Sequence, residues 1–443
     1  MQLPIAFAER MQRLLGEEYS AFCAALEQPK AVALRCNPTH LSPEALATAL
    51  GVELTAVGYE PYGYFANRAP SGKHPLHHAG AFYMQDPSAM LTVASVEVPQ
   101  GGMVLDLCAA PGGKTTQLAA HMQGKGVLVA NEIDLGRAKI LLGNVERMGI
   151  ANALVTSLAP SAVADTFGAA FDLVVVDAPC SGEGMFRKNP QAVALWNPGN
   201  VALCQSRGRQ ILDCAMRCVR QGGKLVYSTC TFAPEENEQA VQYMLDSGDF
   251  CQISTKEGVQ KATAEGVGQP LSRRFYPHLG AGEGHFVAVL ERVTPTPAPP
   301  KPKLPSPLTS AERKLVQSFA KENLTHLDLD SVWRIGENLF YLPNPCALPQ
   351  FALLTYGVKL GSVQKGRFVP HHMFFKCLAD RFLRHTDLSL EDARTAAYLH
   401  GDTIEVSHSS GYGVVEVMGC PLGGVKATDY QGKNHYPKGL RND

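Results

Sequence analysis

Two cysteines that each follow a predicted β-strand are the residues of this chain best placed to do chemistry. Cys180 lies in the segment Asp177-Ala-Pro-Cys180, and Cys230 lies in Ser228-Thr-Cys-Thr231. The carboxyl ends of parallel strands meet at one edge of a sheet, so we expect both thiols to face one crevice. A thiol in a crevice can attack an electrophilic substrate and form a covalent intermediate. The alternative is a pair of unrelated thiols in the core.

A segment rich in small residues, Asp106-Leu-Cys-Ala-Ala-Pro-Gly-Gly-Lys114, is predicted to connect an earlier strand to a helix. It does not match a phosphate-binding loop, because Cys108 stands where that motif requires a glycine. The small residues after Cys108 are Ala109, Ala110, Pro111, Gly112 and Gly113. They let a ligand approach the backbone, and the helix N-terminus offers free N–H groups to a carboxylate. The segment is therefore predicted to bind a cofactor, and the alternative is an ordinary tight turn.

An acidic residue follows the next predicted strand. Glu132 comes about twenty residues after the cofactor loop, a position from which an acid binds ribose hydroxyls in nucleotide sites. The loop allows a ligand close to the backbone, an acid is present for the ribose hydroxyls, and no phosphate-binding motif occurs. This combination fits S-adenosyl-L-methionine better than ATP or NAD. The sequence thus predicts this cofactor. It predicts no metal site, because no Cys-x-x-Cys pair occurs.

The elements that must position these residues alternate between strand and helix from about residue 100 to 293, which indicates a parallel α/β sheet. The predicted strands are nearly continuous apolar runs, as expected for strands covered on both faces. They are Met103–Leu107, Val127–Asn131, Ala153–Thr156, Leu173–Asp177 and Lys224–Ser228. A long helix is predicted over Val201–Arg220, ended by Gln221-Gly222-Gly223.

Composition divides the chain into four predicted parts. Residues 1–95 form a mixed α/β unit, and residues 96–293 form the catalytic domain. Residues 294–309 are so rich in proline that we expect an extended, semi-rigid linker. Residues 310–443 form a second folded region. The elements predicted at the two ends are a helical stretch over Phe7–Leu26, a strand over Ala31–Arg35, a helix over Ser310–Lys321 and strands over Thr403–Ser407 and Val414–Met418.

Composition also narrows the class of protein. A formal net charge of −1 excludes a uniformly basic nucleic-acid coat, so an RNA partner would need local basic patches. One candidate is the C-terminal tail with Lys426, Lys433, Lys438 and Arg441. No apolar run reaches the roughly 18 residues of a membrane span, and the first residues do not resemble a secretion signal. Twelve cysteines without a regular framework fit a reducing cytoplasm.

Three segments, in this order, resemble the signature blocks of the RNA cytosine-5 methyltransferases, the Sun family. They are Asp106–Thr116, Asp177–Lys188 and Tyr227–Glu238. The likeness extends to Gly80–Met90, Gly282–Val287 and Lys433–Arg441, and it is greatest to bacterial members that modify ribosomal RNA. The resemblance implies a Rossmann-like S-adenosylmethionine-dependent methyltransferase core with an N-terminal RNA-binding extension. It also implies a C-terminal α+β region that is PUA-like and recognises RNA.

The resemblance implies roles for single residues. Residues Cys108 to Lys114, Glu132 and Asp177 would line the cofactor site, and Lys114 would also support the catalytic thiol. Asp177 would be the acid beside the base, provided that burial near a negative partner raises its pKa. One position departs from the family pattern, because Ala159 stands where many members place an acid near the adenine. No residue is therefore assigned to the adenine.

The residues alone do not decide which thiol attacks. DNA cytosine-5 methyltransferases attack from a Pro-Cys pair, which Pro179-Cys180 provides, whereas the resembling RNA enzymes attack from the Thr229-Cys230 block and use the other thiol for release. Pro234-Glu235-Glu236 is typical of a helix start, whose dipole would favour a thiolate at Cys230. Finding both blocks favours the RNA class, with Cys230 as nucleophile and Cys180 as release helper.

These observations predict a cytoplasmic, monomeric enzyme that methylates C5 of cytosine in RNA. The expected partner is small-subunit ribosomal RNA, free or in the assembled subunit, and neither DNA nor a membrane is expected. Two alternatives stay open, the same chemistry on transfer RNA and a non-catalytic RNA-binding assembly factor that kept the fold. The presence of Cys180, Cys230, Asp177 and Lys114 argues against the non-catalytic factor.

Overall fold

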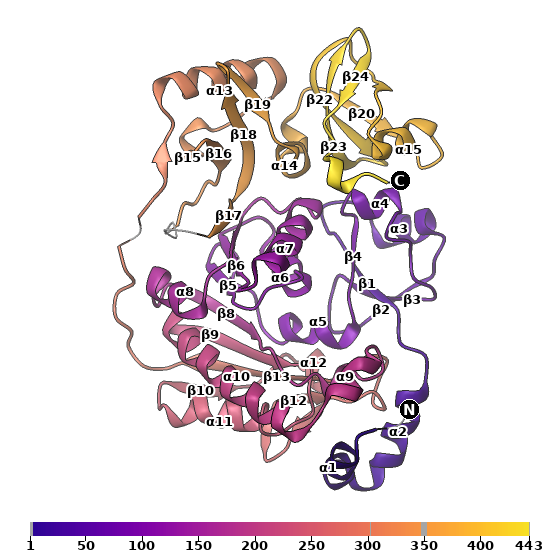
Figure 1. The fold of residues 1–443 in the computed structure, drawn as a ribbon, viewed down its shortest axis with the longest axis vertical. Helices are drawn as coiled ribbons and strands as arrows, with labels where there is room; N and C mark the ends of the chain where they lie inside the picture. The colour runs from indigo at the N-terminus through magenta and orange to yellow at the C-terminus, as the bar shows by residue number, and fades with distance from the viewer. Residues whose placement is uncertain (1–2, 302, 347–351, 443) are drawn as a thin grey trace.

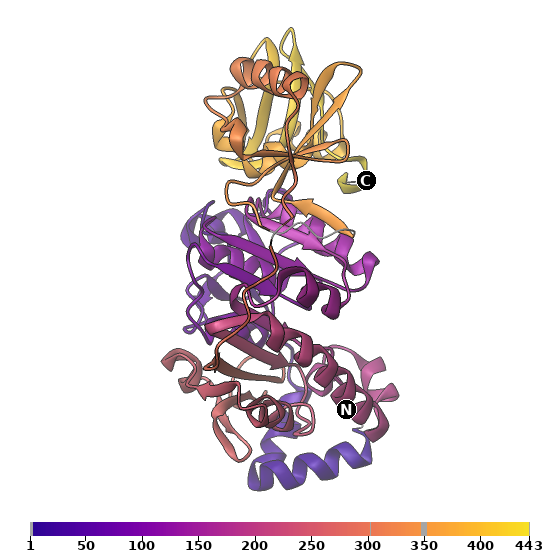
Figure 2. The same cartoon turned by 90° about the vertical axis from the view of Figure 1, so that its left-hand side faces the viewer.

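The computed structural model describes residues 3–301, 303–346 and 352–442. Small parts of the predicted linker (residue 302) and C-terminal region (347–351 and 443) therefore lie outside the described residues. Figure 1 shows an elongated molecule with the C-terminal sheets at one end, the first two helices at the other and the large sheet between them. Figure 2 shows the same tiers from the side.

The N-terminal part combines a helix pair with a small antiparallel sheet of strand order β2-β3-β1-β4. Its strands are β1 (Ala33–Cys36), β2 (Leu54–Ala56), β3 (Gly63–Ala66) and β4 (Phe82–Met84). Its helices are α1 (Ile5–Leu15), η1 (Gly16–Glu18), α2 (Tyr19–Glu27), α3 (Pro43–Leu50), α4 (Pro75–His78) and α5 (Pro87–Ala94). Phe7 and Phe22 are fully buried and pack against Phe232, so the helix pair is fixed to the segment that carries Cys230.

The large sheet positions the predicted site. Its strand order within the described residues is β11-β12-β13-β9-β8-β5-β6-β7-β17, with β10 paired to β13. The stretch from β9 to β7 is parallel, as the sequence predicts. The strand bounds are β5 (Met103–Asp106), β6 (Val127–Asn131), β7 (Ala153–Thr156), β8 (Phe171–Asp177), β9 (Val219–Thr229), β10 (Phe250–Ile253), β11 (Ala264–Gly266), β12 (Gln269–Phe275) and β13 (His285–Arg292). Val174, Val175 and Val176 are fully buried, which confirms that both faces are covered.

Helices pack on both faces of this sheet. They are α6 (Gly113–Met122), α7 (Leu135–Arg147), α8 (Pro160–Phe167), η2 (Glu183–Met185), α9 (Pro190–Leu195), α10 (Pro198–Cys218), α11 (Glu238–Asp246) and α12 (Glu257–Lys261). No helix in the described part of the chain is long and apolar enough to cross a bilayer.

Two predicted helix boundaries are wrong. Helix α10 ends at Cys218, and β9 follows at once, so Gln221-Gly222-Gly223 does not cap the helix. Gly222 instead takes a φ of 70° inside the irregular start of β9. Helix α11 begins at Glu238, after the turn formed by residues 234–237, because the side chain of Glu236 is drawn into a tertiary contact. The predicted helix dipole behind Cys230 is therefore not supported.

The C-terminal part forms two further sheets within the described residues, with orders β14-β15-β16-β18-β19 and β20-β22-β23-β24-β21. The first contains β14 (Ser306–Pro307), β15 (Val332–Ile335), β16 (Asn338–Tyr341), β18 (Val358–Gln364) and β19 (Arg367–Pro370). The second contains β20 (His385–Leu388), β21 (Ile404–Glu405), β22 (Ser410–Val417), β23 (Cys420–Thr428) and β24 (Gln431–Asn434). The helices are α13 (Ser310–Asn323), η3 (Leu329–Ser331), α14 (His372–Cys377), η4 (Ala379–Arg381), α15 (Ala393–His400) and η5 (Lys438–Leu440). The predicted helix after residue 309 and both predicted strands are thus present.

The C-terminal part is not separate from the catalytic sheet. Strand β17 (Leu353–Tyr356) pairs antiparallel with β7 at the edge of the large sheet (Figure 1). Its Tyr356 is fully buried in the same apolar cluster as Leu154 of β7. Residues beyond the predicted linker at 294–309 thus complete the sheet of the predicted catalytic domain, a pairing that the sequence does not predict.

Candidate active site

A cavity of about 730 Å³ lies at the carboxyl ends of the parallel strands. It brings together six of the residues predicted for the site, namely Cys108, Ala110, Glu132, Asp177, Cys180 and Cys230. The other predicted residues form the turn and the start of α6 behind this surface; they are Ala109, Pro111, Gly112, Gly113 and Lys114. Gly112 is required there, because its φ of 113° is strained for other residues.

The two cysteines lie side by side in this cavity. The Sγ atoms of Cys180 and Cys230 are 3.4 Å apart, within hydrogen-bonding range for sulfur. This hydrogen bond, together with burial, raises the pKa of the Cys180 thiol well above its ordinary value. Cys180 therefore keeps its proton and can direct it to the sulfur of Cys230. Two unrelated core thiols would not share one cavity wall, so that alternative does not fit.

A half-buried ion pair lies beside the thiols. Lys114 Nζ donates to Asp177 Oδ2 at 2.7 Å, and Ser228 Oγ donates to Asp177 Oδ1 at 2.9 Å. Burial raises the pKa of Asp177, but the charge of Lys114, the neighbouring His285 and the hydrogen bonds from Lys114 and Ser228 together outweigh burial and hold this pKa below its usual range. Asp177 is therefore an ionised acceptor. The prediction that it is a protonated acid is wrong, because its close partner is positive rather than negative. Sequence reasoning also missed Ser228 as its second donor.

The opposite end of the cavity carries the predicted ribose acid. Glu132 is buried and accepts a hydrogen bond from the backbone N–H of Asp134 at 3.1 Å. Arg137 forms an ion pair with Glu132 at 3.3 Å and donates to the carbonyl oxygen of Ala110 at 2.9 Å. Arg137 thus joins the end of β6 to the cofactor loop, a role that sequence reasoning missed.

Ala159 occupies the position where many family members place an acid near the adenine. Ala159 is the N-cap of α8 and makes no side-chain capping hydrogen bond. The next two residues, Pro160 and Ser161, line the cavity. Among the described residues, no group of three or more His, Cys, Asp or Glu is arranged to hold a metal ion.

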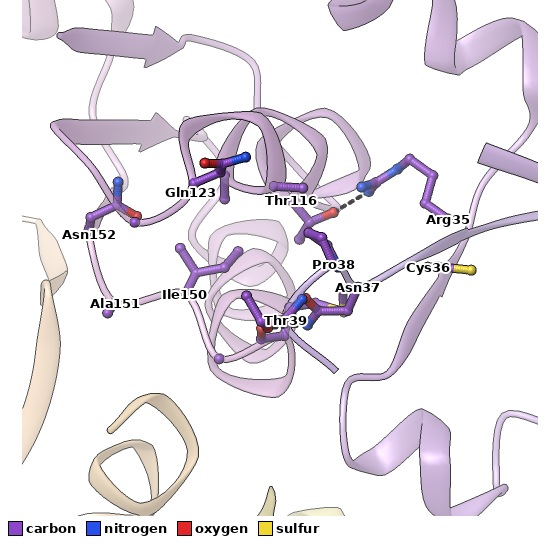
Figure 3. A pocket seen from close by; sticks show the side chains of 15 residues that line it. Arg35, Cys36, Asn37, Pro38, Thr39, Thr116, Gln123, Ile150, Ala151 and Asn152 are labelled. Atoms are coloured by element: carbon purple, nitrogen blue, oxygen red, sulfur yellow. Dashed lines mark hydrogen bonds between the residues drawn. The ribbon is translucent and has the colours of Figure 1, made fainter. Parts of the chain in front are cut away.

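The N-terminal part holds the start of α6 from behind. Arg35 is buried and donates to the carbonyl oxygen of Gly113 at 2.9 Å. It also donates to Thr116 Oγ1 at 2.6 Å (Figure 3). Its Nε donates to Gln85 Oε1 at 2.5 Å. Arg35 also lines a second cavity of about 350 Å³ between the N-terminal part and α6. Arg35 could not be predicted from the sequence, because its hydrogen-bond partners are at least 50 residues away.

Four family models match successive parts of this chain. They describe the N-terminal domain of 16S rRNA methyltransferase RsmF (residues 3–87), 16S rRNA methyltransferase RsmB/F (93–291), the RsmF rRNA methyltransferase first C-terminal domain (318–378) and the methyltransferase RsmF PUA domain (385–442). Curated relatives match over the whole length. Ribosomal RNA small subunit methyltransferase F of Klebsiella pneumoniae is 32% identical over 99% of this chain and 97% of its own. The enzyme of that name from Erwinia tasmaniensis is 30% identical over the same shares.

This chain belongs to the RsmF family. It is therefore an S-adenosylmethionine-dependent methyltransferase that acts on ribosomal RNA, with an α/β core and a C-terminal PUA domain. The predicted family, fold class and cofactor are confirmed.

Solved structures place the core of this RsmF-family chain among known folds. A crystal structure of PH0851 is 28% identical and covers 66% of this chain and 66% of its own, with a TM-score of 0.62. A methyltransferase homolog protein from Pyrococcus horikoshii is 28% identical over 65% of this chain and 95% of its own, with a TM-score of 0.58. NSun6 from Pyrococcus horikoshii, solved with SFG, shares the fold at 21% identity over 66% of this chain and 98% of its own, with a TM-score of 0.59.

One buried atom tests whether the site suits a cofactor with a positive amino group. Asp106 ends β5 one residue before the cavity-lining Leu107, and its Oδ2 accepts from Thr115 at 2.6 Å. Its Oδ1 is buried with no hydrogen-bond partner among the described residues. Burial raises the pKa of Asp106 to about 7. Asp106 lies behind the cavity surface formed by Leu107 and Cys108, and a cationic donor such as the α-ammonium of S-adenosyl-L-methionine has the chemistry to satisfy this oxygen.

Proposed function

We propose that this RsmF-family enzyme methylates C5 of cytosine in small-subunit ribosomal RNA through a covalent bond between Cys230 and C6. C5 of cytosine is a weak nucleophile until a thiolate adds to C6 and pushes electron density onto C5. When bound, S-adenosyl-L-methionine supplies the methyl group that C5 then receives. The C5 proton then passes to solvent water, and the electron pair of the C5–H bond restores the C5–C6 double bond as the Cys230–C6 bond breaks with its electron pair going to sulfur.

The observation that carries this proposal is the pair of thiols 3.4 Å apart on one cavity wall. Cys180 lies within hydrogen-bonding range of the Cys230 sulfur, which suits a proton donor at release, and attack is assigned to Cys230 from its Thr229-Cys230 block. Cys180 is then placed to donate its proton to the departing Cys230 sulfur. The prediction from the Thr229-Cys230 block, that Cys230 attacks and Cys180 assists release, is therefore kept. The helix dipole predicted behind Cys230 does not contribute to it.

The ionised Asp177 takes a different role from the predicted one. Held by Lys114 and Ser228, it can accept a hydrogen bond from the exocyclic amino group of cytosine and fix the ring beside Cys230. The target base must leave its stack to reach this depth. At the other end of the cavity, Glu132 would hold the ribose hydroxyls of the cofactor and Asp106 its ammonium group.

The choice of substrate rests on the relatives and on the C-terminal PUA domain. The matched relatives bear the name ribosomal RNA small subunit methyltransferase F, which favours 16S RNA over transfer RNA. The paired thiols and the Lys114–Asp177 ion pair disfavour a non-catalytic assembly factor, which needs neither. Action in the cytoplasm and as a monomer stay predictions.

Methyl transfer to mixed cellular RNA, followed by mapping of the modified base, tests the proposal. We expect label in small-subunit ribosomal RNA as 5-methylcytosine. Label found in transfer RNA alone would show that the substrate is transfer RNA. Modification at an atom other than C5 would contradict the proposed chemistry, and no label with any RNA would favour a non-catalytic assembly factor.

A further inference from the structure

Hydrogen bonds join the two loops that carry the thiols. Ser181 follows Cys180, Thr231 follows Cys230, and their hydroxyl oxygens lie 2.8 Å apart. The backbone N–H of Gly184 donates to the carbonyl oxygen of Cys230 at 2.9 Å. The separation of the two sulfur atoms therefore depends on how these loops are held, and not only on the strands that precede them.

One carboxylate holds the first of these loops. Glu236 Oε2 accepts from the backbone N–H of Ser181 at 2.9 Å, and Oε1 accepts from its hydroxyl at 2.5 Å. Glu236 is 3% exposed, so water competes little for these hydrogen bonds. Its own carbonyl oxygen accepts from the hydroxyl of Tyr227 at 2.6 Å, which fixes the residue to β9. Both carboxylate oxygens thus bind the residue directly after Cys180.

We propose that Glu236 is a positioning residue for product release, because its carboxylate holds Cys180 against Cys230 through Ser181. The inference rests on the proposed function, in which Cys180 gives its proton to the departing Cys230 sulfur. The carboxylate of Glu236 binds Ser181 rather than either thiol, so it acts through Ser181 and the Thr231 hydroxyl. The attack of Cys230 on the base does not require Glu236. Loss of Glu236 should therefore slow product release rather than attack.

The surroundings of Glu236 make this hold sensitive to pH. Burial raises the pKa of Glu236 to about 7, although the hydrogen bonds from Ser181 oppose this. The charged groups that face it are Glu183 from η2, which raises the pKa further, and Arg10 from α1, which lowers it. Glu236 also faces the thiols of Cys180 and of Cys204 on α10. Protonation below pH 7 removes one acceptor and loosens Ser181, so release should slow as the pH falls.

The test measures the lifetime of the covalent enzyme–RNA complex in the full-length protein with 16S RNA and S-adenosyl-L-methionine. The variants are Glu236→Ala, Glu236→Gln and, as a matched control, Glu235→Gln, whose carboxylate lies 3.8 Å from Arg10. Cofactor affinity, melting temperature and single-turnover methyl transfer are measured alongside. We expect Glu236→Ala to lengthen the complex lifetime by roughly tenfold or more, the scale of a small misplacement of a reacting group. Cofactor affinity and the control should stay within about twofold of the wild-type enzyme.

The conservative variant separates positioning from a structural role. Glu236→Gln keeps one acceptor but cannot titrate, so its release rate should be intermediate and flat between pH 6 and 8, whereas wild-type release should slow below pH 7. The proposal would be overturned if a folded Glu236→Ala variant released RNA at the wild-type rate. It would also be overturned if the rates of attack and of release fell by the same factor. If Glu236→Ala does not fold, a pH inflection that persists in Glu236→Gln would overturn it. A Cys180→Ala enzyme run in parallel must trap the complex, and its failure would refute the proposed function instead.

Discussion

Replacing Lys114 with methionine tests the charge state of Asp177 most sharply. The substitution keeps a long apolar side chain but removes the Nζ–Oδ2 contact of 2.7 Å. Breaking a fully buried ion pair costs about 3–5 kcal/mol and an exposed one about 0–1 kcal/mol. The side chains of Lys114 and Asp177 are 12% and 30% exposed, so this pair lies between these limits. We expect Lys114→Met to lower the free energy of unfolding by about 2 kcal/mol at pH 7.

The loss should depend on pH in a defined direction. The pKa of Asp177 is below its usual value in the folded protein, so the pair stabilises the fold above an unfolded pKa of about 3.9. That stabilisation disappears as the pH falls through the folded pKa of Asp177. The difference between wild type and Lys114→Met should therefore be present at pH 7 and shrink toward pH 3. Methyl transfer should also fall, because Asp177 is then protonated more easily and accepts less well from the base.

Urea unfolding of a double-mutant cycle measures the pair directly. The cycle contains Lys114→Met, Asp177→Asn and the double variant, with Lys261→Met as a control that breaks the exposed pair with Glu257. The control should change the stability by less than about 0.5 kcal/mol. A coupling energy near zero between Lys114 and Asp177 would refute the account of an ionised, lysine-held Asp177.

Three further predictions follow from the cofactor site and the sheet edge. Glu132→Ala should weaken S-adenosyl-L-methionine binding by about 1–3 kcal/mol in calorimetry, the cost of hydroxyls without an acceptor, and unchanged affinity would contradict its role. Because the pKa of Asp106 is about 7, the affinity should fall by roughly tenfold from pH 8 to pH 6 in the wild type, and Asp106→Asn should remove this dependence. A chain ending at residue 309 lacks β17 and should melt at a lower temperature with weaker cofactor binding; an unchanged melting temperature would show that the β7 edge does not need β17.

The strand ends of the site could be predicted from the sequence. Asp177 ends an apolar strand, Cys108, Glu132, Cys180 and Cys230 follow one closely, and parallel strands place such residues on one edge. Local pattern and topology therefore suffice to assemble these side chains.

The rest depends on contacts between distant residues. The segment Pro234-Glu235-Glu236 has the local pattern of a helix start, but Glu236 binds Ser181, 55 residues away, and the helix starts later. The charge of Asp177 depends on Lys114, 63 residues away, and on Ser228, 51 residues away. Strand β17 could not be predicted, because an edge pairing depends on an exposed partner strand that only the folded sheet provides.

The central claim is that Cys230 attacks the base and Cys180 releases it. The most direct test is one denaturing gel of Cys180→Ala, Cys230→Ala and the double variant after reaction with 16S RNA and labelled S-adenosyl-L-methionine. We predict that only Cys180→Ala accumulates a covalent RNA complex, because attack and methyl transfer proceed but the departing sulfur of Cys230 lacks its proton donor. A complex that requires Cys180 and survives the loss of Cys230, or no complex with Cys180→Ala, would contradict the account.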